Sequence, residues 1–340
     1  MAKVPRLGRW LYLEVVILLI VLLAGAGELH AQALSCLGLP ASGQVTSSPI
    51  SCTVRCAAGG TIASAVALKP QTTNTLTITI HGTCVGSVDD VPSDVTLQAG
   101  PHGATLQAPS SSTNPVLGIS GKGVTLTGLT ITGGVNALRG HSGSAFTGNN
   151  LLVEGASNAD VLLTHADLTL NTSMVQNSAG DGIDANWGSA VFLNGGVVQG
   201  NAGYGANIGS DASLEVFGGA VLQKNVVAGA QAFAGGTVDI SDGTVENNAT
   251  TVGGVSGLLT GHGGHLLLTG GSTSVANNGG RGILVQGSGT AMPASTINPA
   301  WAAAMRAISR SHVAKLPTTT SGARIRASAG RNPSEALIRK

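Results

Sequence analysis

Charged side chains are scarce in this chain. Lys, Arg, Asp and Glu make up 10% of the 340 residues, against about 25% in a typical globular domain. The few charges are also uneven, because residues 34–297 hold six basic and thirteen acidic side chains, whereas eight basic residues and one acidic residue follow. A mildly acidic body with only 3% aromatic residues lacks the basic, aromatic patches that bind nucleic acid. We therefore expect no nucleic-acid partner.

A hydrophobic run long enough to cross a membrane is also missing. The apolar stretch Val15–Gly27 has thirteen residues, whereas a membrane-spanning helix needs about 20. Basic residues precede this stretch, and the small-x-small triplet Ala31-Gln32-Ala33 follows it, which is the order of a secretory signal peptide and its cleavage site. We expect residues 1–33 to be a signal peptide, with no membrane span after cleavage and a secreted, periplasmic or cell-surface location. The alternative is an uncleaved membrane anchor.

Cysteine is sparse, and its four positions follow the expected cleavage point: Cys36, Cys52, Cys56 and Cys84. The gaps of fifteen, three and twenty-seven residues lack the two C-x₂₋₄-C pairs of a structural zinc site. An even number of cysteines in an exported chain predicts two disulfides, with three possible pairings that the sequence leaves open. We expect no metal and no cofactor.

Glycine, in contrast, is abundant, with 51 residues, and it takes part in an internal repeat. Between Met174 and Gln286 five tiers follow one another, each with an apolar residue three places before an asparagine. The asparagines are separated by 24, 24, 23 and 30 residues and are Asn177, Asn201, Asn225, Asn248 and Asn278. A glycine soon follows each of them, at Gly182, Gly205, Gly229, Gly253 and Gly282. Short runs with alternating apolar residues come next in each tier.

Short alternating runs that recur at a fixed period predict a β-solenoid. Each strand pairs in parallel with its counterpart one coil away, at about 4.8 Å, so that equivalent side chains form columns. We expect two inward columns: Ile183, Ala206, Ala230, Val255 and Ile283 in one, and Val191, Leu214, Val238 and Leu266 in the other. The asparagines should form a hydrogen-bonded ladder. The outward column would hold Asp184, Asn207, Gln231 and Ser256.

Similar runs upstream extend the solenoid toward the N-terminus. Gly123–Gly134 contains two alternating runs, and Leu76–Ile80 and Val95–Leu97 look like the first coils. The total is about ten coils, or a rod on the order of 45–50 Å. The crossover rule for parallel strands predicts right-handed winding.

The tiers, the asparagine ladder and runs such as Gly123–Gly134 resemble the right-handed parallel β-helix (pectate-lyase-like) superfamily, in the form of bacterial exported β-helix-repeat proteins. The resemblance covers about residues 60–290. It implies an all-β fold but no single function, because such a fold hosts lyases, hydrolases, epimerases, adhesins and inert surface proteins.

Both ends of a solenoid need caps. We expect residues 34–90 to form a disulfide-bearing N-terminal cap and the first coils, and residues 91–296 the main β-helix. Asn298 and Pro299 are typical of a helix start, so residues 297–316 are predicted to form a short C-terminal capping helix. The basic, Ser- and Thr-rich segment 317–340 is expected to be disordered.

Enzymes on this scaffold act along one outward strand face, so the outward polar residues are the candidate site. They comprise the column above together with residues at the preceding turn, and the predicted binding face is Asp181, Asp184, Tyr204, Asn207 and Gln231. Tyr204 and Trp187 are aromatic residues available to stack on a sugar ring.

One segment, Gly180–Asp184, resembles the catalytic segment of polygalacturonase-type glycoside hydrolases. Gly261-His262-Gly263 and Arg324-Ile325-Arg326 resemble two further motifs of that family. The Asn-Thr before the family's aspartate is replaced by Ala179-Gly180, and the next coil lacks the family's paired aspartates. Glycoside hydrolysis needs two carboxyl groups that converge on one bond, so we expect no catalytic residues of this kind.

Two clusters of side chains contain residue types that can bind a metal ion. Asp89-Asp90 with Asp94 is interpreted as a solvated turn, and His262 with His265 as a glycine-rich loop without a third ligand. The sequence therefore favours an exported, non-catalytic protein that binds polysaccharide or cell-surface glycan or has a structural role at the surface. A divergent lyase, hydrolase or epimerase acting on acidic polysaccharide and an adhesin or passenger-like fragment remain the alternatives.

Overall fold

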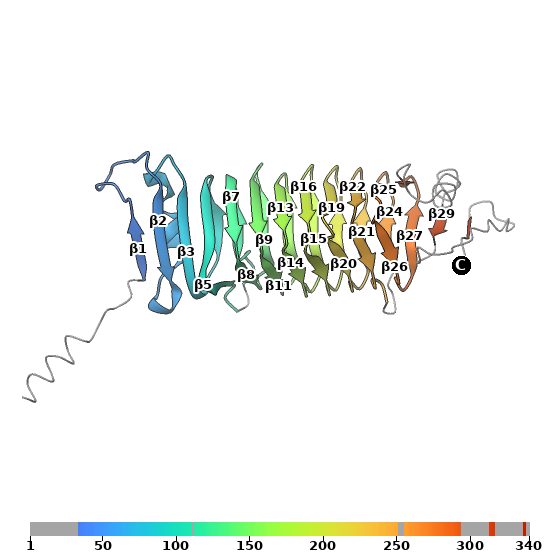
Figure 1. The fold of residues 1–340 in the computed structure, drawn as a ribbon, viewed down its shortest axis with the longest axis horizontal. Helices are drawn as coiled ribbons and strands as arrows, with labels where there is room; N and C mark the ends of the chain where they lie inside the picture. The colour runs from blue at the N-terminus through green and yellow to red at the C-terminus, as the bar shows by residue number, and fades with distance from the viewer. Residues whose placement is uncertain (1–32, 111, 251–254, 294–312, 317–335, 338–340) are drawn as a thin grey trace, which may run out of the picture.

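The computed structural model describes residues 33–110, 112–250, 255–293, 313–316 and 336–337. In this part of the chain the strands form a long rod of stacked coils (Figure 1). Over residues 122–286 each coil contributes a strand to each of three faces, and nearly all neighbours along a face are parallel. The expected single parallel β-helix of about ten coils is confirmed.

The first face holds the strands that come first in each coil. They are β2 (Ile50–Arg55), β3 (Leu76–Val85), β5 (Val95–Gln107), β7 (Lys122–Thr127), β10 (Ala145–Asn149), β13 (Asp167–Asn171), β16 (Ala190–Asn194), β19 (Ser213–Phe217), β22 (Thr237–Ser241), β25 (His265–Thr269) and β28 (Thr290–Pro293).

The second face follows after a tight corner. Its strands are β8 (Leu129–Thr132), β11 (Leu152–Glu154), β14 (Met174–Gln176), β17 (Val197–Gln199), β20 (Val221–Gln223), β23 (Thr244–Glu246) and β26 (Ser274–Ala276). The long strands β3 and β5 bend from the first face into the second, since β5 pairs with β7 and then with β8.

The third face carries the candidate site. Its strands are β4 (Val88–Val91), β6 (Leu117–Ile119), β9 (Asn136–His141), β12 (Ala159–Thr164), β15 (Asp181–Asn186), β18 (Tyr204–Ile208), β21 (Ala228–Ala232), β24 (Ser256–Thr260) and β27 (Arg281–Gln286).

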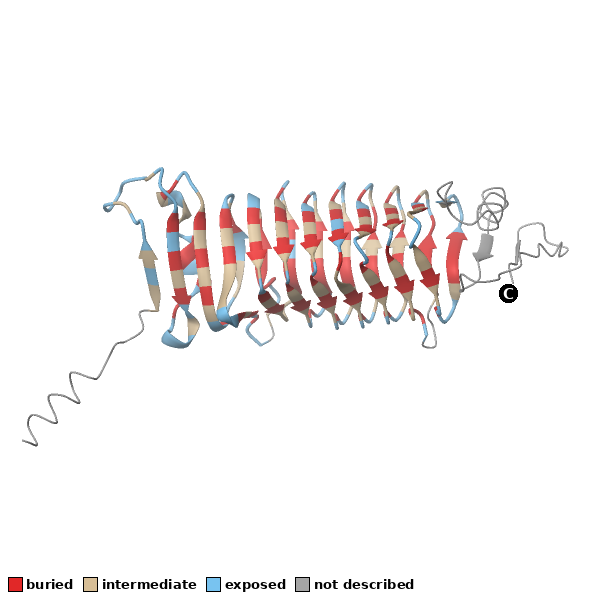
Figure 2. Cartoon of the chain, viewed as in Figure 1, coloured by how far each residue is buried: buried red, intermediate tan, exposed pale blue. Residues whose placement is uncertain are grey.

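Buried residues alternate with more exposed ones along the strands (Figure 2), and the buried side chains form the core of the rod. The expected columns are found: Val191, Leu214, Val238 and Leu266 are paired in register and buried. Ile183, Ala206 and Ala230 form the other column. Burial of each valine, leucine or isoleucine side chain in these columns is worth about 1.5–3 kcal/mol. The core of each coil is therefore stabilised by the coils on both sides.

The asparagine ladder is confirmed for four of the five expected residues. The Nδ2 groups of Asn201, Asn225 and Asn248 each donate to the Oδ1 of the next asparagine, at 2.9, 2.9 and 3.0 Å, ending on Asn278. The prediction for Asn177 is wrong. That residue is exposed with φ of 62°, and the buried Ser178 takes its place, with its backbone N–H donating to Asn201.

A second correction concerns the longer tier after Asn248. The connection between β23 and β24 runs from Glu246 to Ser256 and is longer than that between β20 and β21, so most of the extra residues of this tier lie there. The inward residue of this tier is therefore Leu258, not Val255. Ser256 is fully buried, and Leu259 takes the outward position expected for it.

The N-terminal end carries two disulfides, Cys36–Cys52 and Cys56–Cys84, as expected, and the structure selects this pairing. Strand β1 (Leu34–Leu37) pairs antiparallel with β2. The short helices η1 (Cys56–Ala58), α2 (Ile62–Val66) and η2 (Lys69–Gln71) lie between β2 and β3. Thr61 caps α2, because its side chain accepts the N–H of Ser64.

The expected signal peptide, residues 1–33, lies outside the described part except for Ala33. Most of the expected C-terminal helix, 297–312, also lies outside it. Its last four residues instead form strand β29 (Val313–Leu316), antiparallel to β27. In the tail expected to be disordered, Ala336–Leu337 form strand β30, and the rest lies outside the described residues. No helix of the described part is long and apolar enough to cross a membrane.

Candidate functional site

The five predicted binding residues lie on three neighbouring strands of the third face. Asp184 in β15 pairs with Asn207 in β18, which pairs with Gln231 in β21. Asp181 and Tyr204 open β15 and β18 at the edge of the same face. The structure therefore brings together the residues that the repeat placed in one column, about 4.8 Å apart from coil to coil.

Apolar residues bound this polar patch on both sides. Leu162 precedes Asp184 in the column, and Leu259, only 8% exposed, follows Gln231. The patch thus spans three coils of the rod rather than its full length.

The two carboxyl groups are half-buried and close in sequence and space. Burial raises the pKa of Asp181, although the Tyr204 backbone N–H, at 2.8 Å, and the Asn207 amide stabilise its charged form. Burial also raises the pKa of Asp184, whose Oδ1 accepts from Asn186 Nδ2 at 2.7 Å, and the charge of Asp181 raises it further. Two such carboxyl groups hold protons more readily than free ones.

Tyr204 and Asn207 complete the polar part of the patch. Burial raises the pKa of the Tyr204 phenol, and the charge of Asp181 adds to this effect. The Oδ1 atom of Asn207 is buried and has no hydrogen-bond partner among the described residues. An acceptor without a donor is costly, so this atom favours a neighbouring protonated carboxyl or a ligand hydroxyl.

Aromatic residues border the patch where the strands of the third face end. Phe233 follows β21, and its ring occupies the space that a Cβ at Gly209, one coil earlier, would fill. The same space borders the Oδ1 of Asn186. Trp187 directly follows Asn186 and stacks on His165, with ring centroids 6.4 Å apart and planes 19° from parallel.

Sequence reasoning missed Asn186, His165 and Phe233 as parts of this patch. Asn186 is the next outward position after Asp184 on the same strand, so period-two alternation could have found it. The contact of Phe233 with Gly209 depends on a side chain that leans back over the previous coil, and no local pattern signals that.

Two of the three motifs resembling polygalacturonases lie in the described residues, and these two do not converge. Asp181 opens β15, whereas His262 follows β24, three coils further along the third face, or roughly 14 Å at the spacing of parallel strands. Arg324 lies outside the described residues. The motif residues that the structure describes therefore do not bring carboxyl groups of different coils together.

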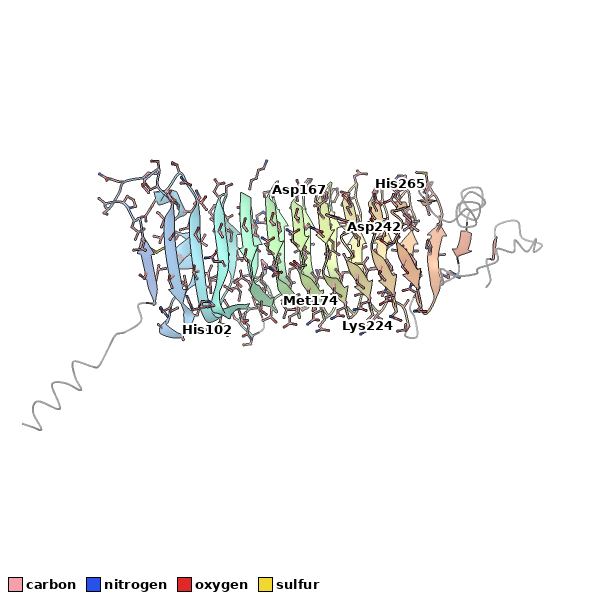
Figure 3. The ribbon with its side chains drawn as sticks, in the orientation of Figure 1. His102, Asp167, Met174, Lys224, Asp242 and His265 are labelled. Carbon is pink, nitrogen blue, oxygen red and sulfur yellow. A yellow bond between two sulfur atoms is a disulfide. The ribbon has the colours of Figure 1, made fainter. Side chains whose placement is uncertain are left out.

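No group of three or more metal-ligating side chains occurs in the described ranges. His265, labelled near the C-terminal end of the rod in Figure 3, contacts Thr290 Oγ1 through Nδ1 at 2.7 Å. Asp89 and Asp90 lie in the short strand β4, and the Ser120 hydroxyl donates to Asp90.

Comparison with known proteins gives a likeness of architecture only. No family model matches the chain, and no curated protein matches it. The A-module of the mannuronan C-5 epimerase AlgE6 from Azotobacter vinelandii is similar with a TM-score of 0.45 and 10% identity, over 69% of this chain and 81% of that one. An alginate lyase from Paenibacillus sp. str. FPU-7 is similar with a TM-score of 0.39 and 13% identity, over 68% of this chain and 96% of that one.

Proposed function

We propose that this protein is exported and binds polysaccharide through Asp181, Asp184, Tyr204, Asn207 and Gln231. The observation that carries the proposal is the register of these side chains on three adjacent strands, ended on both sides by leucine. Carboxyl, amide and phenol groups at fixed spacing suit a ligand with many hydroxyl groups, because each can donate to or accept from a hydroxyl.

Export is supported by the N-terminal segment and by the disulfides. A basic start, a short apolar run and a small-x-small triplet are typical of a signal peptide. Disulfides persist in oxidising compartments outside the cytoplasm.

The binding test uses the purified full chain and a panel of soluble polysaccharides in affinity electrophoresis, followed by calorimetry on any that retard it. A Gln231→Ala, Asn207→Ala double variant should lose binding, while Thr147→Ala on the first face, matched in exposure, should keep it. Unchanged retardation of the double variant would refute this site, and failure of the wild-type chain to bind any polysaccharide would refute the function.

Asp181, Asp184 and Tyr204 favour acid–base catalysis on a glycan as a second candidate function. Burial raises all three pKa values, as expected for groups that hold a proton for transfer. Release of reducing ends or unsaturated products from uronic-acid polymers, lost in Asp181→Asn, would establish the enzyme. Product release that survives in an Asp181→Asn, Asp184→Asn double variant would place catalysis elsewhere.

A further inference from the structure

We propose that Trp187, supported by His165, is the platform on which one pyranose ring of an uncharged polysaccharide stacks. This inference rests on the proposed function, since it adds a subsite and a ligand class to the same surface. It assigns a role to an aromatic pair that the hydrogen-bonding patch itself does not use.

The indole of Trp187 is exposed to solvent. Trp187 is 60% exposed, although a large apolar side chain normally gains by burial. Both Trp187 and His165 sit at the corner between the third and first faces, with φ of 58° and 52°. Bulky residues rarely adopt this region, so the fold holds an aromatic side chain outward at a position that favours a smaller residue.

Among the described residues, His165 is the one aromatic ring that stacks on the indole of Trp187. His165 covers it from the preceding coil. The following coil places Gly209 and Ser210 at this corner, and Gly188 N–H donates to the Ser210 carbonyl. Neither residue has a side chain large enough to cover an indole, and the Phe233 ring that fills the space over Gly209 is not stacked on Trp187.

Trp187 lies directly beside the polar patch, at the end of strand β15. Trp187 follows Asn186, and Asn186 donates to Asp184, so the platform continues strand β15 out of the polar patch. At about 3.3 Å per residue, Trp187 lies roughly 10 Å along the strand from Asp184. One glycan chain can therefore stack on the indole and reach the carboxyl and amide groups together.

The ligand class follows from the charges. The hydrogen bonds to Asp181 and Asp184 come from a backbone N–H and from amides, and no basic side chain is among the groups that shift their pKa values. Arg139 is in the same column as Asp184 but two coils away, beyond Leu162. The body of the protein also has seven more acidic than basic residues. A polyanion would be repelled here, whereas a neutral sugar offers hydroxyls to the carboxyls and C–H groups to the indole.

The experiment compares binding of neutral polysaccharides (mixed-linkage glucan, galactomannan, xylan) with polyuronates (polygalacturonate, alginate), using the full chain. Trp187→Ala should weaken binding of the best neutral ligand about tenfold, the usual loss on removing an aromatic anchor. Phe192→Ala, which removes another exposed aromatic from the first face, should leave affinity unchanged. The chain has three tryptophans, so in a Trp10→Phe, Trp301→Phe variant the fluorescence reports Trp187 alone and should shift to shorter wavelength with ligand.

The outcomes separate this inference from the proposed function. Loss of binding in the Gln231→Ala, Asn207→Ala variant with full affinity in Trp187→Ala would refute the platform and keep the site. Tighter binding of polyuronates than of neutral polymers would refute the ligand class. Failure of the wild-type chain to bind any polymer would overturn the proposed function and this inference together.

Discussion

Asp160 stands where five later coils carry glycine: Gly182, Gly205, Gly229, Gly257 and Gly282. A Cβ added at Gly182 would collide with the side-chain amide of Asn201 in the next coil. The coil after Asp160 carries Ser178 instead of asparagine, which leaves room for a side chain. Asp160 Oδ1 accepts the Ala156 N–H at 2.9 Å, and Oδ2 has no partner among the described residues. The aspartate thus satisfies the backbone where the ladder stops.

The stability of the fold should fall as the pH rises between the two pKa values of the Asp160 carboxyl, that of the unfolded chain and that of the native state. Burial, aided by the charge of Glu154, raises the pKa of Asp160 to about 8, against 3.8 in the unfolded chain. The native state then binds one more proton than the unfolded state between these values, so the free energy of unfolding decreases with pH by up to about 1.4 kcal/mol per unit. Chemical denaturation of the wild type at pH 5, 6, 7 and 8 measures this slope.

Asp160→Asn should flatten that slope, because an amide keeps the acceptor for Ala156 and never ionises. Asp167→Asn, at an exposed position, serves as the control and should leave the slope unchanged. The raised pKa values of Asp181 and Asp184 contribute with the same sign, so the test is the difference between wild type and variant. Equal slopes in wild type and Asp160→Asn would contradict the assignment.

At the scale of elements, the ladder links one coil to the next. Asn225 accepts the backbone N–H of Asn201 and donates to the Val198 carbonyl, in addition to its bonds within the ladder. Its removal leaves buried backbone groups without partners, each at about 1–3 kcal/mol. Asn225→Ala should therefore lower the free energy of unfolding by about 2–5 kcal/mol, measured by denaturant titration.

Asn194→Ala is the matched control for this change. Asn194 also bonds to an asparagine one coil away, Asn171, but on the exposed first face. Its replacement should stay within about 0.5 kcal/mol of the wild type. Similar losses in the two variants would mean that the buried ladder stabilises the rod no more than a surface pair does.

The glycine column makes a related prediction. A Cβ at Gly205 would collide with the Gly229 carbonyl and the Asn225 amide, whereas one at Gly271 would meet nothing within 4 Å. Gly205→Ala should cost about 1–3 kcal/mol through overpacking, and Gly271→Ala should cost nothing measurable by the same titration. A stable Gly205→Ala protein would show that neighbouring coils can separate at this column.

These elements also show what the sequence can predict. The period, the inward columns and four ladder residues were predictable because stacking requires like residues at equal intervals. The prediction for Asn177 was wrong because Val175, not Met174, is the residue equivalent to Val198. The two possible alignments differ by only one position. The prediction that Val255 points inward was wrong because the connection before β24 is longer than in the other tiers, and the sequence does not show where this strand begins. The patch on β15 to β21 was predictable from the same columns. Phe233 and Trp187 also lie one coil after Gly209 and His165 in the same register, but the spacing does not encode how their rings lean over the previous coil.

At the scale of the whole molecule, a solenoid is quasi-one-dimensional, because each coil contacts only its neighbours. Both disulfides lie at one end, where Cys36–Cys52 joins β1 to β2 and Cys56–Cys84 joins η1 to β3. Reduction should therefore act locally. Each lost bridge typically costs about 2–5 kcal/mol, but the loss should be confined to the first coils instead of spreading over the rod.

Hydrogen exchange followed by mass spectrometry tests this on the full chain with and without reductant. Amides of β1, β2 and β3 should lose protection on reduction, while those of β15, β18 and β21 should keep it, as should polysaccharide binding. A Cys36→Ser, Cys52→Ser variant isolates the first bridge and should affect β1 and β2 most. Equal loss of protection along all coils would mean that the rod unfolds as one cooperative unit, in which case the N-terminal bridges stabilise the distant binding face as well.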